Sequence, residues 1–280
     1  MRYPTLVFTL LLGAAAGADV SFVEEITNSG VGPKKVGARK QTNQVFIKGE
    51  RQRVHSEIQT SKETAQALQK QGQSLNGSTV LRLDRANVYQ IDHAKQVFVQ
   101  SALPAPAPGA AAGSAAKPAA KDPAGPEVAV QVKDFPDTSR IEGILCRRVA
   151  VEMHARYYEP GTRNLRRENR YLYQAWISKD FPAYQEIRQF ETLQNRKTSY
   201  PPLVRGGLEQ LKDAADDYGL LAGQLAALEG LPMESVLKVF VNTGGKEQQV
   251  FQLNRRIKAF SYSAVPDSVF ELSKNLQRVK

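Results

Sequence analysis

The chain has 280 residues, 41% of them hydrophobic, and its 38 Lys and Arg against 28 Asp and Glu give a net charge of +10. A chain of this length buries a hydrophobic core as one large or two small domains. Its single cysteine, Cys146, excludes an internal disulfide, so stability has to come from packing.

The chain begins with the features of a cleavable secretory signal peptide. Arg2 precedes an apolar run over residues 6–12, and Ala16-Gly17-Ala18 fits the small-x-small pattern that signal peptidase reads. The apolar run is shorter than the ~20 residues that a membrane-spanning helix needs. We therefore predict a signal peptide over residues 1–18, cleavage after Ala18 and a soluble, periplasmic protein that does not span the membrane.

The next part of the chain is predicted to be mostly β-structure. Residues 45–47 and 51–58 read as two strands joined by a tight turn at Gly49. Residues 62–71 have helix-forming composition, and Gly72 ends that helix. Three short strands follow, over residues 80–84, 87–92 and 96–100.

These short strands carry an alternating pattern. Leu81, Leu83, Tyr89 and Ile91 alternate with polar residues. Such a period of two is typical of a sheet with one packed face and one solvent-facing face. We therefore predict that these four side chains share the packed face.

Residues 102–126 are almost entirely Ala, Pro and Gly. Repeated proline prevents a continuous helix or strand ladder, and the segment has no apolar face to bury, so a disordered linker or surface loop is predicted. The composition leaves two organisations open. Residues 19–101 and 127–280 are either separate domains or one domain with a long insertion.

The second part of the chain mixes strands and helices. Asp180-Phe181-Pro182 is a typical helix start, and a second helix is predicted over residues 204–229 because apolar residues recur there at three- or four-residue spacing. The strands are predicted over residues 143–153, 168–177, 234–241 and 248–262. The order of elements indicates an α+β protein with a mostly antiparallel sheet.

The residues that carry chemistry in enzymes are few. His55, His93 and His154 have no ligand-like spacing, so we predict no metal site and no cofactor. Cys146 lies in a predicted strand, where a free cysteine usually packs as a small hydrophobe. We therefore expect no enzymatic activity, with a Cys146-dependent reaction as the alternative.

Two surfaces are candidates for binding. Strands that are apolar on both faces, at residues 97–99 and 236–241, either fill a core or turn one face toward an apolar ligand. The candidate ligand-lining residues are Leu81, Leu83, Tyr89, Ile91, Trp176, Phe240, Phe251 and Leu253. The candidate basic surface, which would attract an anionic surface or an envelope protein, consists of Arg163, Arg166, Arg167 and Arg170. No nucleic-acid recognition motif is visible.

Several segments in order resemble the DUF4412 family of exported bacterial proteins. The resemblance spans roughly residues 45–272, and the segments that carry it are Ile47–Arg53, Leu81–Asp84, Val88–Asp92, Ile141–Cys146, Ala175–Asp180, Gly230–Met233 and Pro266–Leu272. It implies a fold like that of the periplasmic lipoprotein carriers LolA and LolB. There a curved antiparallel sheet forms an incomplete barrel, helices cover or plug its open side, and acyl chains bind between them.

The resemblance also implies a single domain over residues 19–280, interrupted by the Ala/Pro-rich insertion at 102–126. The family has no established activity, and a shared fold does not transfer function. We expect a periplasmic carrier or sensor that binds a lipid or other apolar ligand in a half-barrel cavity. The alternative is an envelope interaction module that uses the basic surface and has no ligand cavity.

Overall fold

The structure, a computed structural model, describes residues 19–32, 35–106, 126–159, 161–162, 164–180, 182–199 and 217–279. The predicted signal peptide, most of the Ala/Pro-rich segment and the first part of the predicted helix at 204–229 lie outside these residues. So does Arg163 of the candidate basic surface. Among the described residues, no helix is both long and apolar enough to cross a membrane.

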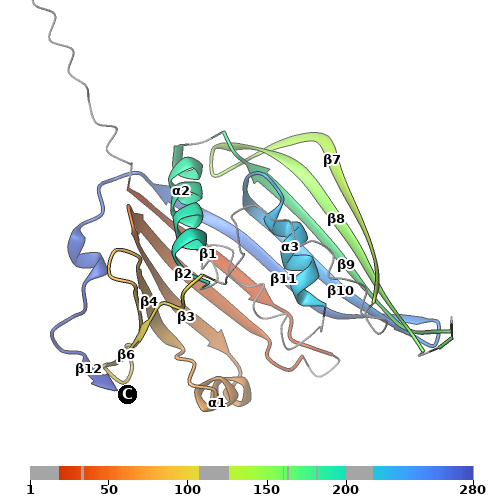
Figure 1. Ribbon diagram of the computed structural model, residues 1–280, viewed down its shortest axis with the longest axis horizontal. Coiled ribbons are helices and arrows are strands. Elements are labelled where there is room, and N and C mark those ends of the chain that lie inside the picture. The colour runs from red at the N-terminus through yellow and green to blue at the C-terminus, as the bar shows by residue number, and fades with distance from the viewer. Residues whose placement is uncertain are drawn as a thin grey trace, which may run out of the picture.

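The described residues form one large curved sheet of twelve strands that does not close on itself (Figure 1). Its strand order is β12-β6-β5-β4-β3-β2-β1-β11-β10-β9-β8-β7. The strands are β1 (Val20–Asn28), β2 (Arg39–Lys48), β3 (Arg51–Thr60), β4 (Asn76–Arg82), β5 (Asn87–Asp92), β6 (Val97–Ala102), β7 (Glu127–Ile141), β8 (Ile144–Tyr158), β9 (Leu165–Ser178), β10 (Leu231–Thr243), β11 (Lys246–Ser261) and β12 (Gln277–Val279). All neighbouring strands are antiparallel except β12, which runs parallel to β6.

The pairing of β1 with β11 joins the two parts of the chain in the middle of the sheet. Strands β1–β6 precede the Ala/Pro-rich segment, and β7–β11 follow it. Both sets therefore belong to one hydrogen-bonded ladder. The sheet-dominated α+β class predicted from the sequence is confirmed.

Local sequence explains the elements that were predicted best. Gly49 has φ +54° in the turn between β2 and β3, a left-handed conformation that glycine adopts without strain. Helix α1 (Lys62–Lys70) begins after Ser61, whose side chain accepts a hydrogen bond from the backbone N–H of Thr64. The hairpin and this helix were both predicted correctly.

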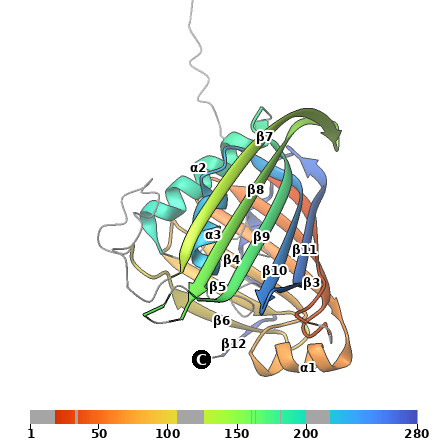
Figure 2. The same cartoon turned by 90° about the vertical axis from the view of Figure 1, so that its right-hand side faces the viewer.

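Two further helices, α2 (Pro182–Lys197) and α3 (Tyr218–Ala226), lie over the same face of the sheet, called here the inner face (Figures 1 and 2). Tyr184, Ile187 and Phe190 recur at three-residue spacing along α2 and are buried, so the helix turns one apolar side toward the sheet. Helix α3 is continuous through Gly219 and Gly223.

The opposite, outer face of β2–β6 is crossed by residues 262–279, called here the C-terminal strap. The strap contains a short 3-10 helix, η3 (Asp267–Phe270), and ends in β12. Val265 and Phe270 of the strap are buried against Val80 of β4 and Ile91 of β5. The strap thereby covers the outer face of the first half of the sheet.

The prediction that Leu81, Leu83, Tyr89 and Ile91 share one packed face is wrong. Leu81 and Leu83 lie in a buried cluster on the inner face, whereas Tyr89 and Ile91 pack under the strap on the outer face. The reason is the pairing register, in which Leu81 faces Val88. Opposite residues share a face, so odd-numbered residues of β4 lie on the same side as even-numbered residues of β5.

Candidate functional site

The inner face carries two separate apolar clusters, one beneath each helix. The α2 cluster contains buried residues of α2, such as Phe190, with Phe22 of β1 and Leu81 of β4. The α3 cluster contains Leu221 and Leu225 of α3 with residues of β8–β11. Burial of apolar area at about 25 cal/mol per Å² makes these contacts the main attachment of the helices to the sheet.

The predicted ligand-lining residues are distributed over three places. Leu81, Leu83 and the half-buried Trp176 belong to or pack against the α2 cluster, while Phe251 and Leu253 belong to the α3 cluster. Tyr89 and Ile91 lie under the strap. Phe240 is half-buried against Arg170, whose Cζ lies 4.4 Å from the centre of its ring. The structure thus brings four of the eight, Leu81, Leu83, Phe251 and Leu253, to the inner face in two groups, whereas Trp176 alternates along β9 with Ala175 and Ile177 of the α3 cluster.

A buried ion pair separates the two groups. Glu24 follows Phe22 of the α2 cluster and precedes Ile26 of the α3 cluster along β1. Arg255 of β11 donates from Nε to Glu24 Oε2 at 2.7 Å, and the two side chains are 6% and 0% exposed. Asn43 Nδ2 donates to the other Glu24 oxygen at 2.8 Å. The inner face is therefore apolar at both ends and charged between them.

One buried polar side chain of the inner face has no hydrogen-bond partner among the described residues. Gln52 of β3 is 0% exposed, and neither its amide nitrogen nor its amide oxygen forms a hydrogen bond within the part of the chain that the structure describes. Its strand neighbours are Ile47 and Leu81 of the α2 cluster. A buried amide without partners costs about 1–3 kcal/mol, so a polar group that reached it would bind favourably.

Helix α3 is attached by a polar contact at Asp217, the N-cap residue that directly precedes it. Asp217 is buried, and its carboxylate accepts hydrogen bonds from Tyr171 Oη and from Asn169 Nδ2. Burial, followed by the nearby Asp217 carboxylate, raises the pKa of Tyr171 above its ordinary value. The phenol therefore stays protonated and donates to Asp217 at neutral pH.

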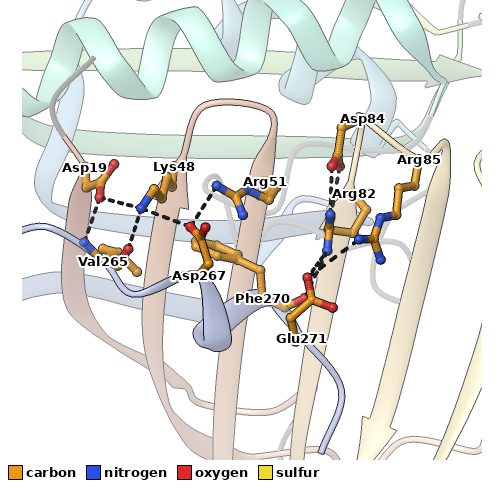
Figure 3. A network of polar contacts seen from close by, with 10 residues as sticks. All are labelled: Asp19, Lys48, Arg51, Arg82, Asp84, Arg85, Val265, Asp267, Phe270 and Glu271. Atoms are coloured by element: carbon orange, nitrogen blue, oxygen red, sulfur yellow. Dashed lines mark hydrogen bonds and ion pairs between the residues drawn. The ribbon is translucent and has the colours of Figure 1, made fainter. Parts of the chain in front are cut away.

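The strap is held to the outer face by a network of charged side chains (Figure 3). Lys48 Nζ lies 3.0 Å from Asp267 Oδ1 and donates to Val265 O at 2.8 Å. Arg82 forms ion pairs with Asp84 and with Glu271 of the strap at 2.7 and 2.8 Å. A hydrogen bond from Arg82 holds the pKa of Asp84 below its ordinary value. The contact thus joins two of the segments that carry the family resemblance, Leu81–Asp84 and Pro266–Leu272.

Beside this network, two histidines far apart in sequence share one serine. His55 Nδ1 and His93 Nε2 lie 3.1 and 2.8 Å from Ser78 Oγ, and the two ring centres are 5.2 Å apart. Arg53 donates to Ser78 Oγ and to the strap carbonyl of Val269. Sequence spacing did not reveal this cluster, because the register of β3, β4 and β5 creates it.

This cluster makes stability depend on pH. Burial first, and then the nearby His55 and Arg53, hold the pKa of His93 below its ordinary value of 6.5. The unfolded chain therefore binds a proton at a pH where folded His93 does not, so stability is lost as the pH falls below about 6.5. We expect His93→Gln to flatten this loss between about pH 7 and pH 5 in urea unfolding curves. If the free energy of unfolding of His93→Gln falls with pH as steeply as that of the wild type, His93 does not cause the loss of stability.

The basic stretch is largely engaged within the sheet. Arg167 lies with its Cζ 4.4 Å from the centre of the Tyr157 ring. Arg170 forms a two-bond ion pair with Glu247, at 2.8 and 2.6 Å. Arg166 is exposed. The ion pair with Glu247 neutralises the charge of Arg170, and the Tyr157 ring holds the guanidinium of Arg167 against the sheet.

Cys146 is 1% exposed, and burial raises the pKa of its thiol. A protonated thiol is a poor nucleophile, which agrees with its predicted packing role. No three His, Cys, Asp or Glu side chains within the described ranges converge as metal ligands.

Comparison of the sequence with models of known protein families gives no match. Comparison with curated proteins gives none either.

Proposed function

We propose that this protein is an exported carrier or sensor that binds a lipid or another apolar ligand between the inner face of its sheet and its helices. In this proposal the sheet is an incomplete barrel, and α2 and α3 cover its open side. The observation that supports it best is the unpartnered Gln52 amide buried in the α2 cluster. Such a group favours an amphiphile with a hydrogen-bonding head and an apolar chain.

The position of the helices in the chain supports a removable cover. Both helices belong to the segment 179–230, which connects β9 to β10. Its two ends adjoin, because Ser178 of β9 pairs with Leu231 of β10. Tyr184 Oη accepts a hydrogen bond from the backbone N–H of Gly230, which ties the start of α2 to the end of the segment. The helices can therefore lift from the inner face while every strand pair remains formed.

The predicted signal peptide supports a periplasmic location, where carriers of apolar molecules shield them from water. The resemblance to the DUF4412 family and the LolA/LolB fold points to the same kind of ligand. The basic-surface alternative is less favoured, since Arg167 and Arg170 are engaged with neighbouring side chains.

Trp176 provides a direct binding assay, because it is the only tryptophan and packs against the α2 cluster. Delipidated protein is titrated with brominated fatty acid or brominated phospholipid, and we expect saturable quenching of Trp176 fluorescence. Unbrominated lipid should reverse the quenching by competition. Absence of saturable quenching by either lipid would contradict the proposal.

Gln52→Leu separates stability from binding. We expect the free energy of unfolding to rise by about 1–3 kcal/mol, because an unsatisfied buried amide is replaced by an apolar side chain of similar size. Affinity for the fatty acid should fall at the same time, because its carboxyl group loses a hydrogen-bonding partner. Gln90→Leu, at an exposed position of β5, is the matched control and should change neither property. Unchanged affinity in Gln52→Leu would remove Gln52 from the ligand site.

A further inference from the structure

Strand β7 forms a free edge of the sheet in the part of the chain that the structure describes. It pairs with β8 on one side, and it is 15 residues long (Figure 2). Natural edge strands are usually protected by proline, by bulges or by charges. In β7 the bulge lies between Asp134 and Thr138 and contains Pro136, so only its second half is interrupted in this way.

The first half of β7 carries exposed valines on the inner face. Val128, Val130 and Val132 are 38%, 38% and 50% exposed. Their partners on β8, in the same order, are the buried residues Ala155, Met153 and Val151. Met153 and Val151 belong to the α3 cluster. The apolar inner face thus continues to the edge and remains partly open there. A further strand beside β7 would cover these valines and use the free backbone groups of the edge.

The sequence of β7 is complementary to itself. If two copies pair antiparallel with Val130 facing its own counterpart, Val128 faces Val132 of the second copy. On the other face of the sheet, Glu127 then faces Lys133 of the second copy. Lys133 forms no ion pair with any described residue, whereas Glu127, whose side chain is 62% exposed, lies 3.6 Å from Arg156 of β8 and can also reach a second cation. Opposite charges and paired valines both stabilise directly opposed strand positions.

Other registers lose this complementarity. A shift of two residues in one direction places Asp134 opposite Val128. A shift of two residues in the other direction leaves Lys133 without Glu127. A shift of one residue places the inner-face valines opposite outer-face residues.

We infer that β7 is a self-association surface and that a second copy of this chain docks on it, antiparallel and centred on Val130. The two sheets become one continuous sheet across a two-fold axis. An isologous contact of this kind closes after two subunits, so it gives a dimer and not a filament.

Charge reversal tests both the dimer and its register. Sedimentation velocity of the full exported chain over a range of concentrations should show a monomer–dimer equilibrium. Glu127→Lys and Lys133→Glu should each weaken dimerisation by about tenfold or more, because each dimer contains two such pairs. The double variant Glu127→Lys/Lys133→Glu should restore the wild-type dissociation constant.

Lys62→Glu on α1 is the matched control, because Lys62 is exposed and lies outside β7. It should leave the dissociation constant unchanged, and circular dichroism should show that every variant is folded. A wild-type chain that stays monomeric at all concentrations would overturn the inference. A double variant that dimerises no better than the single variants would overturn the register.

Discussion

Replacing Arg255 with Met is expected to lower the free energy of unfolding by about 3–5 kcal/mol, because the Glu24 carboxylate stays buried without its counter-charge. The two side chains lie almost wholly out of solvent and are joined at 2.7 Å. Breaking such a pair costs far more than breaking an exposed one, which contributes about 0–1 kcal/mol. Urea unfolding followed by Trp176 fluorescence measures the loss.

The double variant Glu24→Gln/Arg255→Met is the control for this interpretation. Gln is neutral and keeps an oxygen that accepts the hydrogen bond from Asn43. We therefore expect the double variant to recover most of the stability lost in the single variant. A double variant as unstable as Arg255→Met would show that the loss comes from the packing of Arg255 and not from the buried charge.

Replacing Phe190 with Ala is expected to cost about 3–5 kcal/mol, since this side chain of α2 is fully buried. In the proposed function, α2 can lift from the inner face while the strand pairs remain formed. The loss of stability should therefore appear first as local opening of α2. Hydrogen exchange should accelerate in α2 much more than in β1, β2 and β11.

Phe22→Ala is the matched control, because Phe22 is buried in the same cluster but belongs to β1. It should accelerate exchange in the central strands together with α2. If Phe190→Ala instead accelerates exchange equally in all of these elements, α2 is an integral part of the sheet's folding unit. The removable cover would then be contradicted.

The parts of the fold that the sequence predicted are those whose signals are local. The turn at Gly49, the cap at Ser61 and the helix start at Pro182 depend only on neighbouring residues. Strand β7 was missed, although Val128, Val130 and Val132 alternate in it with other residues. It follows the Ala/Pro-rich segment directly and lies on an edge, so burial does not mark its faces strongly.

The parts of the site that the sequence did not predict depend on register. His55 and His93 meet at Ser78 because β3, β4 and β5 pair with one particular alignment. The Glu24–Arg255 pair joins residues 231 positions apart, through the β1–β11 contact that joins the two halves of the sheet. Residue composition contains no direct signal for such pairings, since many registers satisfy the same alternation.

The most direct test of the proposed ligand-binding role is native mass spectrometry of the protein purified from the periplasm without delipidation. The proposal predicts a species heavier than the bare chain by the mass of one lipid or acyl ligand, and organic extraction should release that ligand. A spectrum that contains only the bare chain, together with no uptake of fatty acid, phospholipid or acylated peptide by the delipidated protein, would contradict it.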